Sequence, residues 1–147
     1  MRPEETLDFH IKYTWQNISK MYNEVASGFG TTMSVGFILL NVDIDNGTPS
    51  TSLGPKMGME ATSLSRILKT MEEKKLIYRK PHPEDGRSVL ICLTEFGIEK
   101  RELAKEVVLK FNQTMYENLD DQDVQSFFKV LNTVNELINK KEIYQKA

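Results

Sequence analysis

Residues 50–94 read STSLGPKMGMEATSLSRILKTMEEKKLIYRKPHPEDGRSVLICLT, and the first half of this stretch has a helical period. Apolar residues recur at helical steps on both sides of Gly58, which predicts a short helix, a tight turn and a longer second helix. The inward positions are Leu53, Met57, Met59, Leu64, Ile67, Leu68 and Met71. The outward face of the second helix holds Thr62, Ser63, Ser65, Arg66 and Lys69. Hydroxyl groups and cations on the first turns of such a helix suit entry into a DNA major groove.

The second half of the stretch has the composition of β-strands. Residues 76–80 (LIYRK) and 89–93 (VLICL) are short aliphatic runs, and the turn formers PHPEDGRS lie between them. Two helices followed by a two-stranded hairpin predict a winged helix-turn-helix in a mainly α (α+β) fold. Arg87 on the narrow wing tip can reach a minor groove, where the negative potential of A-tracts is greatest.

These motifs resemble those of the multiple-antibiotic-resistance regulator (MarR) family. The similarity lies in GMEATSLSRILKTMEEKKLI (58–77), PEDGRS (83–88) and LTEFG (93–97), and the flanking helices extend it along essentially the whole chain. The resemblance implies that Asp85 on the wing orients Arg87 and that Arg87 contacts DNA. It also implies dimerisation through the terminal helices, and a small-molecule effector that binds between the dimerisation and DNA-binding parts.

One position departs from the family pattern at the end of the second helix. The family usually has Gly after the Glu-Glu-Lys that closes this helix, and this chain has Lys75. If the backbone is left-handed at that position, a residue with a side chain costs about 1–2 kcal/mol. Lys69 and Thr70 also differ in charge from the family pattern, which affects the expected DNA sequence and not the fold.

Composition bounds the class of protein. The chain has 147 residues, 39% hydrophobic and 27% charged, as expected for one globular domain. Its net charge of −2 is unevenly spread, because residues 56–94 carry eight Lys or Arg against five Asp or Glu, whereas the segments on either side are acidic. A basic middle between acidic ends fits a DNA reader joined to a dimerisation region. The early acidic residues and the absence of a long apolar run predict a cytoplasmic protein without a signal peptide or membrane span.

Long amphipathic helices are predicted at both ends of the chain. One covers about 6–28, a shorter one 33–42, another runs from Glu95 to about Tyr116, and the last begins after Asp120. Their apolar stripes are too broad for a small winged domain to cover, so we expect them to pair with a second copy. The predicted layout is 1–30 and 117–147 for dimerisation, 31–94 for DNA binding and 95–116 as a connecting helix. A bundle role unrelated to dimerisation is the alternative.

The positions of individual residues predict which of them contact DNA and which line an effector pocket. Arg66 is the expected guanine reader, because a bidentate Arg contact discriminates between bases by about 1–3 kcal/mol. The expected contacts to the DNA backbone are Ser50 and Lys56, together with Arg79, Lys80 and His82 on the wing. The alternative for each is an ordinary solvated side chain. An effector pocket would be lined by His10, Tyr13, Trp15, Phe37 and Phe111, with Phe9 nearby, although aromatic residues at helical spacing are also typical of plain core.

Catalytic and metal sites have no support in the sequence. It contains no nucleophile elbow, P-loop, dinucleotide fingerprint or HExxH, and His10 and His82 lack neighbouring ligands, so no enzyme activity, metal or cofactor is expected. Cys92 alternates with apolar residues and is expected to be a buried structural thiol. The predicted function is a homodimeric DNA-binding repressor of palindromic sites. The alternatives are a winged module for protein–protein contact and a regulator that responds through Cys92.

Overall fold

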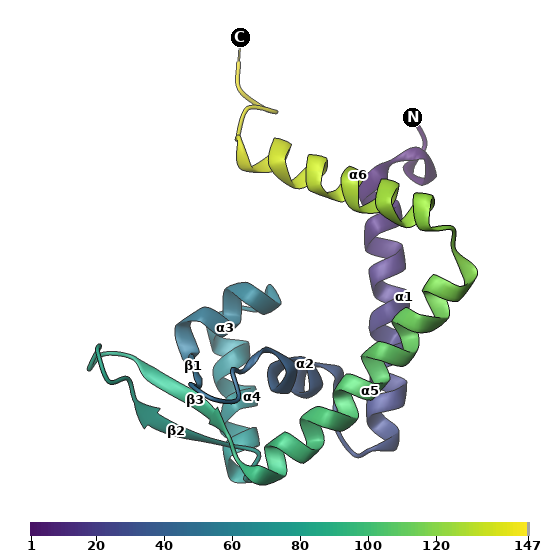
Figure 1. The fold of residues 1–147 in the computed structure, drawn as a ribbon. Coiled ribbons are helices and arrows are strands. Elements are labelled where there is room, and N and C mark those ends of the chain that lie inside the picture. The colour runs from purple at the N-terminus through teal and green to yellow at the C-terminus, as the bar shows by residue number, and fades with distance from the viewer. Residues whose placement is uncertain (147) are drawn as a thin grey trace. The chain divides into compact units, whose positions relative to one another are not determined.

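A computed structural model describes residues 1–146 (Figure 1). Two compact units divide the chain at Val107, the first being Met1–Val107 and the second Val108–Ala147. The elements of the first unit, in order, are η1 (Pro3–Glu5), α1 (Leu7–Gly28), α2 (Met33–Asn41), β1 (Thr48–Pro49), α3 (Ser50–Met57), α4 (Ala61–Glu73), β2 (Ile77–Pro81) and β3 (Val89–Leu93). Helix α5 (Glu95–Asn118) runs from the first unit into the second, which also holds α6 (Asp121–Asn139).

The core of the first unit lies between α2, α3, α4 and the sheet. Leu53, Met71 and Ile91 are completely buried there, and Leu64 and Leu68 are nearly so. Met57, Met59 and Ile67 are half-buried and pack against the same cluster. The prediction of an apolar stripe on these two helices is therefore confirmed. Burial of this stripe places α3 and α4 at a fixed angle and leaves the polar side of α4 in solvent.

The sheet has one more strand than the predicted two-stranded wing. Its order is β1-β3-β2, all antiparallel, with Ile77 opposite Leu93, Pro81 opposite Val89, and Thr48 opposite Ile91. The additional strand is β1, which lies directly before the start of α3 at Ser50. The buried Thr48 hydroxyl accepts a hydrogen bond from the Asp43 amide at 2.8 Å, which fixes the short strand before α3. The β2–β3 hairpin extends away from the helices as a wing (Figure 1).

A left-handed glycine makes the turn between α3 and α4. Gly58 has a φ of +60°, and the Met59 amide donates to the Gly54 carbonyl at 3.0 Å. Pro55 lies in the last turn of the eight-residue α3. Because α3 ends two residues later, the missing proline N–H interrupts little of the helix.

Helix α4 ends in a Schellman motif with Lys75 at its left-handed position. Lys75 has a φ of +61°, its amide donates to the Glu72 carbonyl at 3.0 Å, and the Leu76 amide donates to the Met71 carbonyl at 2.9 Å. Glycine is the usual residue at this position because it has no Cβ. The backbone at Lys75 is therefore left-handed, which is the condition under which the side chain at this position was expected to cost about 1–2 kcal/mol.

Replacing Lys75 with glycine is expected to stabilise the protein. Lys75→Gly removes the left-handed strain at the cost of a more flexible unfolded chain, so the free energy of unfolding should rise by about 0.5–1 kcal/mol. Lys74→Gly is the matched control, because Lys74 has a φ of −82° and glycine there should lower that free energy. Urea denaturation at one protein concentration measures both. An unchanged or reduced stability of Lys75→Gly would contradict the prediction.

The start of α5 is joined closely to the end of α4. The Thr94 hydroxyl donates to the Lys75 carbonyl at 2.6 Å and accepts from the Gly97 amide at 2.9 Å, so Thr94 caps the start of α5. The Thr94 amide donates to the Leu76 carbonyl at 3.1 Å. These four residues, Lys75, Leu76, Thr94 and Gly97, are called the junction below. The junction links the end of α4 and the start of β2 to the start of α5.

The helices at the two ends of the chain have the predicted extents to within a few residues. Helix α1 begins at Leu7, after the unpredicted turn of 3-10 helix at Pro3–Glu5, and α6 follows Asp120 as expected. Thr32 caps α2 by accepting a hydrogen bond from the Val35 amide at 3.3 Å. No helix within the described residues is long and apolar enough to cross a membrane.

Candidate nucleic-acid interface

The polar face of α4 is fully available to a ligand. Its five predicted contact residues are all exposed, while the residues between them, Leu64 and Leu68, are buried in the core. The exposed set is Thr62, Ser63, Ser65, Arg66 and Lys69. Since these residues occupy the first two to three turns, the amino-terminal part of α4 presents hydroxyls and cations on one side.

The tip of the wing is held in shape by Asp85. Its carboxylate accepts a hydrogen bond from the Arg87 amide at 3.0 Å, and its carbonyl accepts one from the Ser88 amide at 3.1 Å. The ion pairs within residues 1–146 do not include one between the side chains of Asp85 and Arg87. Asp85 therefore shapes the backbone under Arg87 and leaves the exposed guanidinium available to a partner.

His82 takes part in the same tip. Its amide donates to the Ser88 carbonyl at 3.2 Å, and its Nδ1 accepts from the Glu84 amide at 3.1 Å. With Nδ1 used as an acceptor, the proton of the neutral ring is on Nε2. The half-buried ring thus closes the tip and retains one donor that points away from this hydrogen bond.

The two cations of β2 lie on opposite faces of the sheet. Arg79 is paired in register with the buried Ile91, on the core side, and its Nε is 3.5 Å from a carboxylate oxygen of Glu72 at the end of α4. Lys80 is paired with Leu90, so its side chain leaves the sheet on the other face. The two residues therefore have different surroundings although they are neighbours in sequence.

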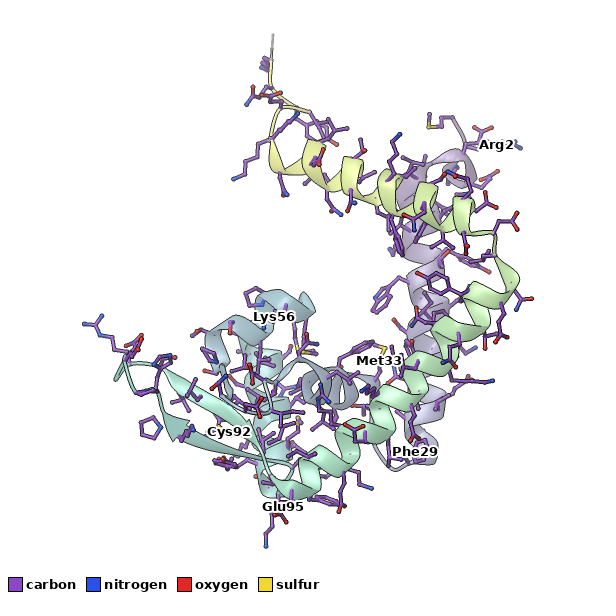
Figure 2. The ribbon with its side chains drawn as sticks, in the orientation of Figure 1. Arg2, Phe29, Met33, Lys56, Cys92 and Glu95 are labelled. Carbon is purple, nitrogen blue, oxygen red and sulfur yellow. The ribbon has the colours of Figure 1, made fainter. Side chains whose placement is uncertain are left out.

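Helix α3 contributes the remaining predicted contacts. Lys56 is exposed in its last turn (Figure 2), and Ser50 is half-buried at its start. The turn before β1 is shaped by Asp43, whose carboxylate accepts from the amides of Asp45 at 2.9 Å and Asn46 at 3.0 Å. The hydrogen bonds from Asn46 and Asp45, and to a smaller extent the charge of Lys56, lower the pKa of the Asp43 carboxyl.

Cys92 is buried in the sheet, as predicted. Its residue is 5% exposed, and its Sγ lies 2.8 Å from the position that a Cβ on Gly47 would occupy. Gly47, with a φ of +72°, therefore packs its backbone directly against the sulfur, and a side chain at this position would collide with it.

The aromatic residues predicted to line an effector pocket do not form one cluster within the first unit. Tyr13 stacks on Phe9 with ring centroids 6.2 Å apart, and His10 meets Phe9 edge-on at 5.3 Å. Phe37 instead meets Tyr22 edge-on at 5.8 Å, and burial raises the pKa of the Tyr22 phenol. Tyr13 and Tyr22 are separated by about 14 Å along α1.

The other two members of the predicted pocket are placed differently. Trp15 is 51% exposed on α1. Phe111 lies on the part of α5 that belongs to the second unit. Within residues 1–146, no group of three or more His, Cys, Asp or Glu side chains could hold a metal ion.

Comparison with known proteins identifies relatives of this chain. Residues 32–89 match the model of the MarR family. The organic hydroperoxide resistance transcriptional regulator of Bacillus subtilis is 30% identical over 107 residues, which cover 73% of this chain and 73% of that protein. The HTH-type transcriptional regulator SarZ of Staphylococcus epidermidis is 26% identical over 117 residues, covering 76% and 79% of the two chains.

Solved structures share the fold. The S. aureus MepR–DNA complex has a TM-score of 0.79 at 21% identity, covering 89% of this chain and 97% of that one. CouR from Rhodococcus jostii RHA1, bound to p-coumaroyl-CoA, has a TM-score of 0.77 at 18% identity, covering 91% and 94%. The prediction of a winged helix-turn-helix is confirmed by these similarities.

Proposed function

The chain belongs to the MarR family of DNA-binding transcriptional regulators, and on that premise we propose that it is a homodimeric repressor of palindromic DNA sites that a small-molecule effector releases. One observation carries the proposal. The exposed hydroxyls and cations of α4 and the exposed Arg87 of the wing belong to the same compact unit, within the basic segment 56–94. Such a surface suits one major groove and the adjacent minor groove.

Different residues have different tasks at this surface. Arg66 reads a guanine, with Thr62, Ser63, Ser65 and Lys69 contacting neighbouring base edges or phosphates. Ser50, Lys56, Lys80 and His82 contact the DNA backbone and fix the register, which carries no sequence information itself. Arg87 enters the minor groove from a tip that Asp85 shapes, through the hydrogen bond from the Arg87 amide.

A second copy of the chain covers the exposed apolar surfaces of the terminal helices. Each unit exposes large apolar side chains on its terminal helix: in α1 these include Leu7, Phe9, Ile11, Tyr13 and Trp15, and in α6 they include Phe127, Phe128, Val130, Leu137 and Ile138. Surfaces of this kind mark protein–protein contacts. Segments 1–30 and 117–147 therefore dimerise, 31–94 binds DNA and 95–116 connects them. Twofold symmetry then matches half-sites about one helical turn apart.

The effector acts by shifting the dimer between forms. CouR is a protein of this fold with a bound small molecule. In this chain the proposed contacts are His10, Tyr13, Trp15, Phe37 and Phe111, and an effector that uses them has to reach both the group at Phe9 and the separate group at Tyr22. An effector releases DNA only if it binds the form with misaligned recognition helices more tightly than the DNA-bound form. A regulator of transcription works beside the DNA, and we propose the cytoplasm as the place where this chain acts.

Binding to the DNA upstream of the protein's own coding sequence tests the proposed function. Fluorescence anisotropy should show affinity for a palindromic upstream duplex about 10³-fold or more above that for a scrambled duplex of the same composition. The logarithm of the affinity should fall steeply with the logarithm of salt concentration, because phosphate contacts release counterions. Equal affinity for both duplexes would leave only a non-specific DNA coat. No binding to either would favour the protein-contact alternative.

A further inference from the structure

We propose that Arg79 is a positioning residue: through Glu72 it holds the wing at a fixed direction relative to α4, and it does not bind DNA itself. The proposal rests on the proposed function, because it concerns how two DNA-reading elements are aligned. It also gives a role to Glu72. A carboxylate so close to the proposed DNA-binding surface would repel phosphates, so its role is to hold Arg79 and not to contact DNA.

The alternation of β2 places Arg79 on the side of α4. Ile77 lies two residues earlier on the same face of the strand and is 2% exposed, and Ile91, opposite Arg79, is completely buried. Arg79 therefore leaves the sheet toward the core side, where its Nε lies 3.5 Å from Glu72. The side chains of Arg79 and Glu72 are 35% and 45% exposed, so the contact is only partly screened by solvent.

Glu72 is unfavourably placed for α4 on its own. It lies in the last turn, where carbonyl groups form the negative end of the helix dipole, and that turn has no basic residue. A carboxylate at this point weakens the helix unless a cation compensates for it. Arg79 is that cation, and it comes from the wing and not from the helix.

The location of the Arg79–Glu72 ion pair allows it to fix the direction of the wing relative to α4. Helix α4 and β2 are joined by the left-handed turn at Lys75, and Arg79 lies beyond this turn in the direction of the tip. Arg66 on α4 and Arg87 on the tip must meet successive grooves together. A change in the direction of the hairpin at the Lys75 turn would move Arg87 out of reach without altering Arg87 itself.

The salt dependence of DNA binding separates positioning from contact. Arg79→Gln is measured against wild type on the upstream duplex between about 50 and 200 mM salt. A positioning role predicts affinity about two- to fivefold weaker with an unchanged slope. Loss of a direct phosphate contact would reduce the slope by about 0.9. Lys80→Gln is the matched control, since it removes one charge from the next residue, on the opposite face of the sheet.

A charge exchange provides the second test. Arg79→Glu alone should weaken binding more than Arg79→Gln, because it places two carboxylates together. Adding Glu72→Arg restores an ion pair with the partners reversed, and the double variant should recover most of the lost affinity. Thermal unfolding of each variant checks that the fold is intact.

The outcomes are distinct for this inference and for the proposed function. A reduced slope for Arg79→Gln, or a double variant that binds no better than Arg79→Glu, would overturn the positioning role. If wild type itself shows no preference for the upstream duplex, the failure lies with the proposed function and not with Arg79.

Discussion

Gly97→Ala is expected to lower the free energy of unfolding by about 3 kcal/mol, the largest stability change we predict for a single methyl group in this chain. An ideal Cβ at Gly97 would overlap the Leu76 carbonyl oxygen and lie 3.1 Å from the carbonyl carbon. The obstacle is backbone, so no side-chain rotation can relieve it. Either α5 or the start of β2 has to move.

The surrounding hydrogen bonds make such a movement costly. The Leu76 carbonyl accepts from the Thr94 amide at 3.1 Å, and the Thr94 hydroxyl connects the Lys75 carbonyl to the Gly97 amide. Moving α5 away from Leu76 would lengthen these bonds together, and each hydrogen bond lost costs about 0.5–1.5 kcal/mol net. The expected midpoint of thermal unfolding falls by about 6–12 °C.

Gly28→Ala is the matched control for this substitution. Gly28 also lies in a helix, its φ is not positive, and no atom of residues 1–146 outside its own helical neighbourhood lies within 4 Å of the position of its Cβ. Alanine there should be neutral or stabilising by up to about 1 kcal/mol, because it favours the helix. Opposite signs at the two glycines would locate the effect in the junction. A Gly97→Ala protein as stable as wild type would show that the junction yields easily.

The parts of the fold that follow a local period were predictable from the sequence. The stripe from Leu53 to Met71 was predicted correctly, and strand β3 was predicted to the residue, because side chains repeat with the period of the backbone that carries them. The exposure of the α4 contact residues follows from the same period. What these residues bind stays a prediction from the sequence.

The features that escaped prediction depend on contacts between distant residues. Strand β1 has only two residues, too few to show a period, and it exists through pairing with Ile91 and Leu90. The closeness of Gly97 to Leu76 is likewise a tertiary contact. The pairing of Arg79 with Glu72 had one readable signal, since Arg79 follows Ile77 by two residues and therefore shares its face.

Arg87→Ala is expected to weaken binding to the upstream duplex by about 10- to 100-fold, since hydrogen bonds from a charged group contribute about 1.5–3 kcal/mol. The salt slope should also fall by about 0.9 or less, depending on whether the guanidinium touches a phosphate or a base edge. Stability should hardly change, because Arg87 is exposed and lies at a loop tip. Anisotropy and urea denaturation measure the two quantities. Binding equal to wild type would remove the wing from the interface.

Substitutions at Arg87 and Asp85 separate charge from geometry at the tip. Arg87→Lys keeps the charge but loses the planar fork, so a minor-groove contact predicts a large loss of affinity, while a simple charge effect predicts none. Asp85→Asn keeps an oxygen that accepts from the Arg87 amide, a bond of 3.0 Å, and should bind nearly as wild type. Asp85→Ala removes that acceptor and should bind as weakly as Arg87→Ala. If Asp85→Asn fails as well, Asp85 acts on Arg87 through its charge, and the shape of the turn alone does not orient the guanidinium.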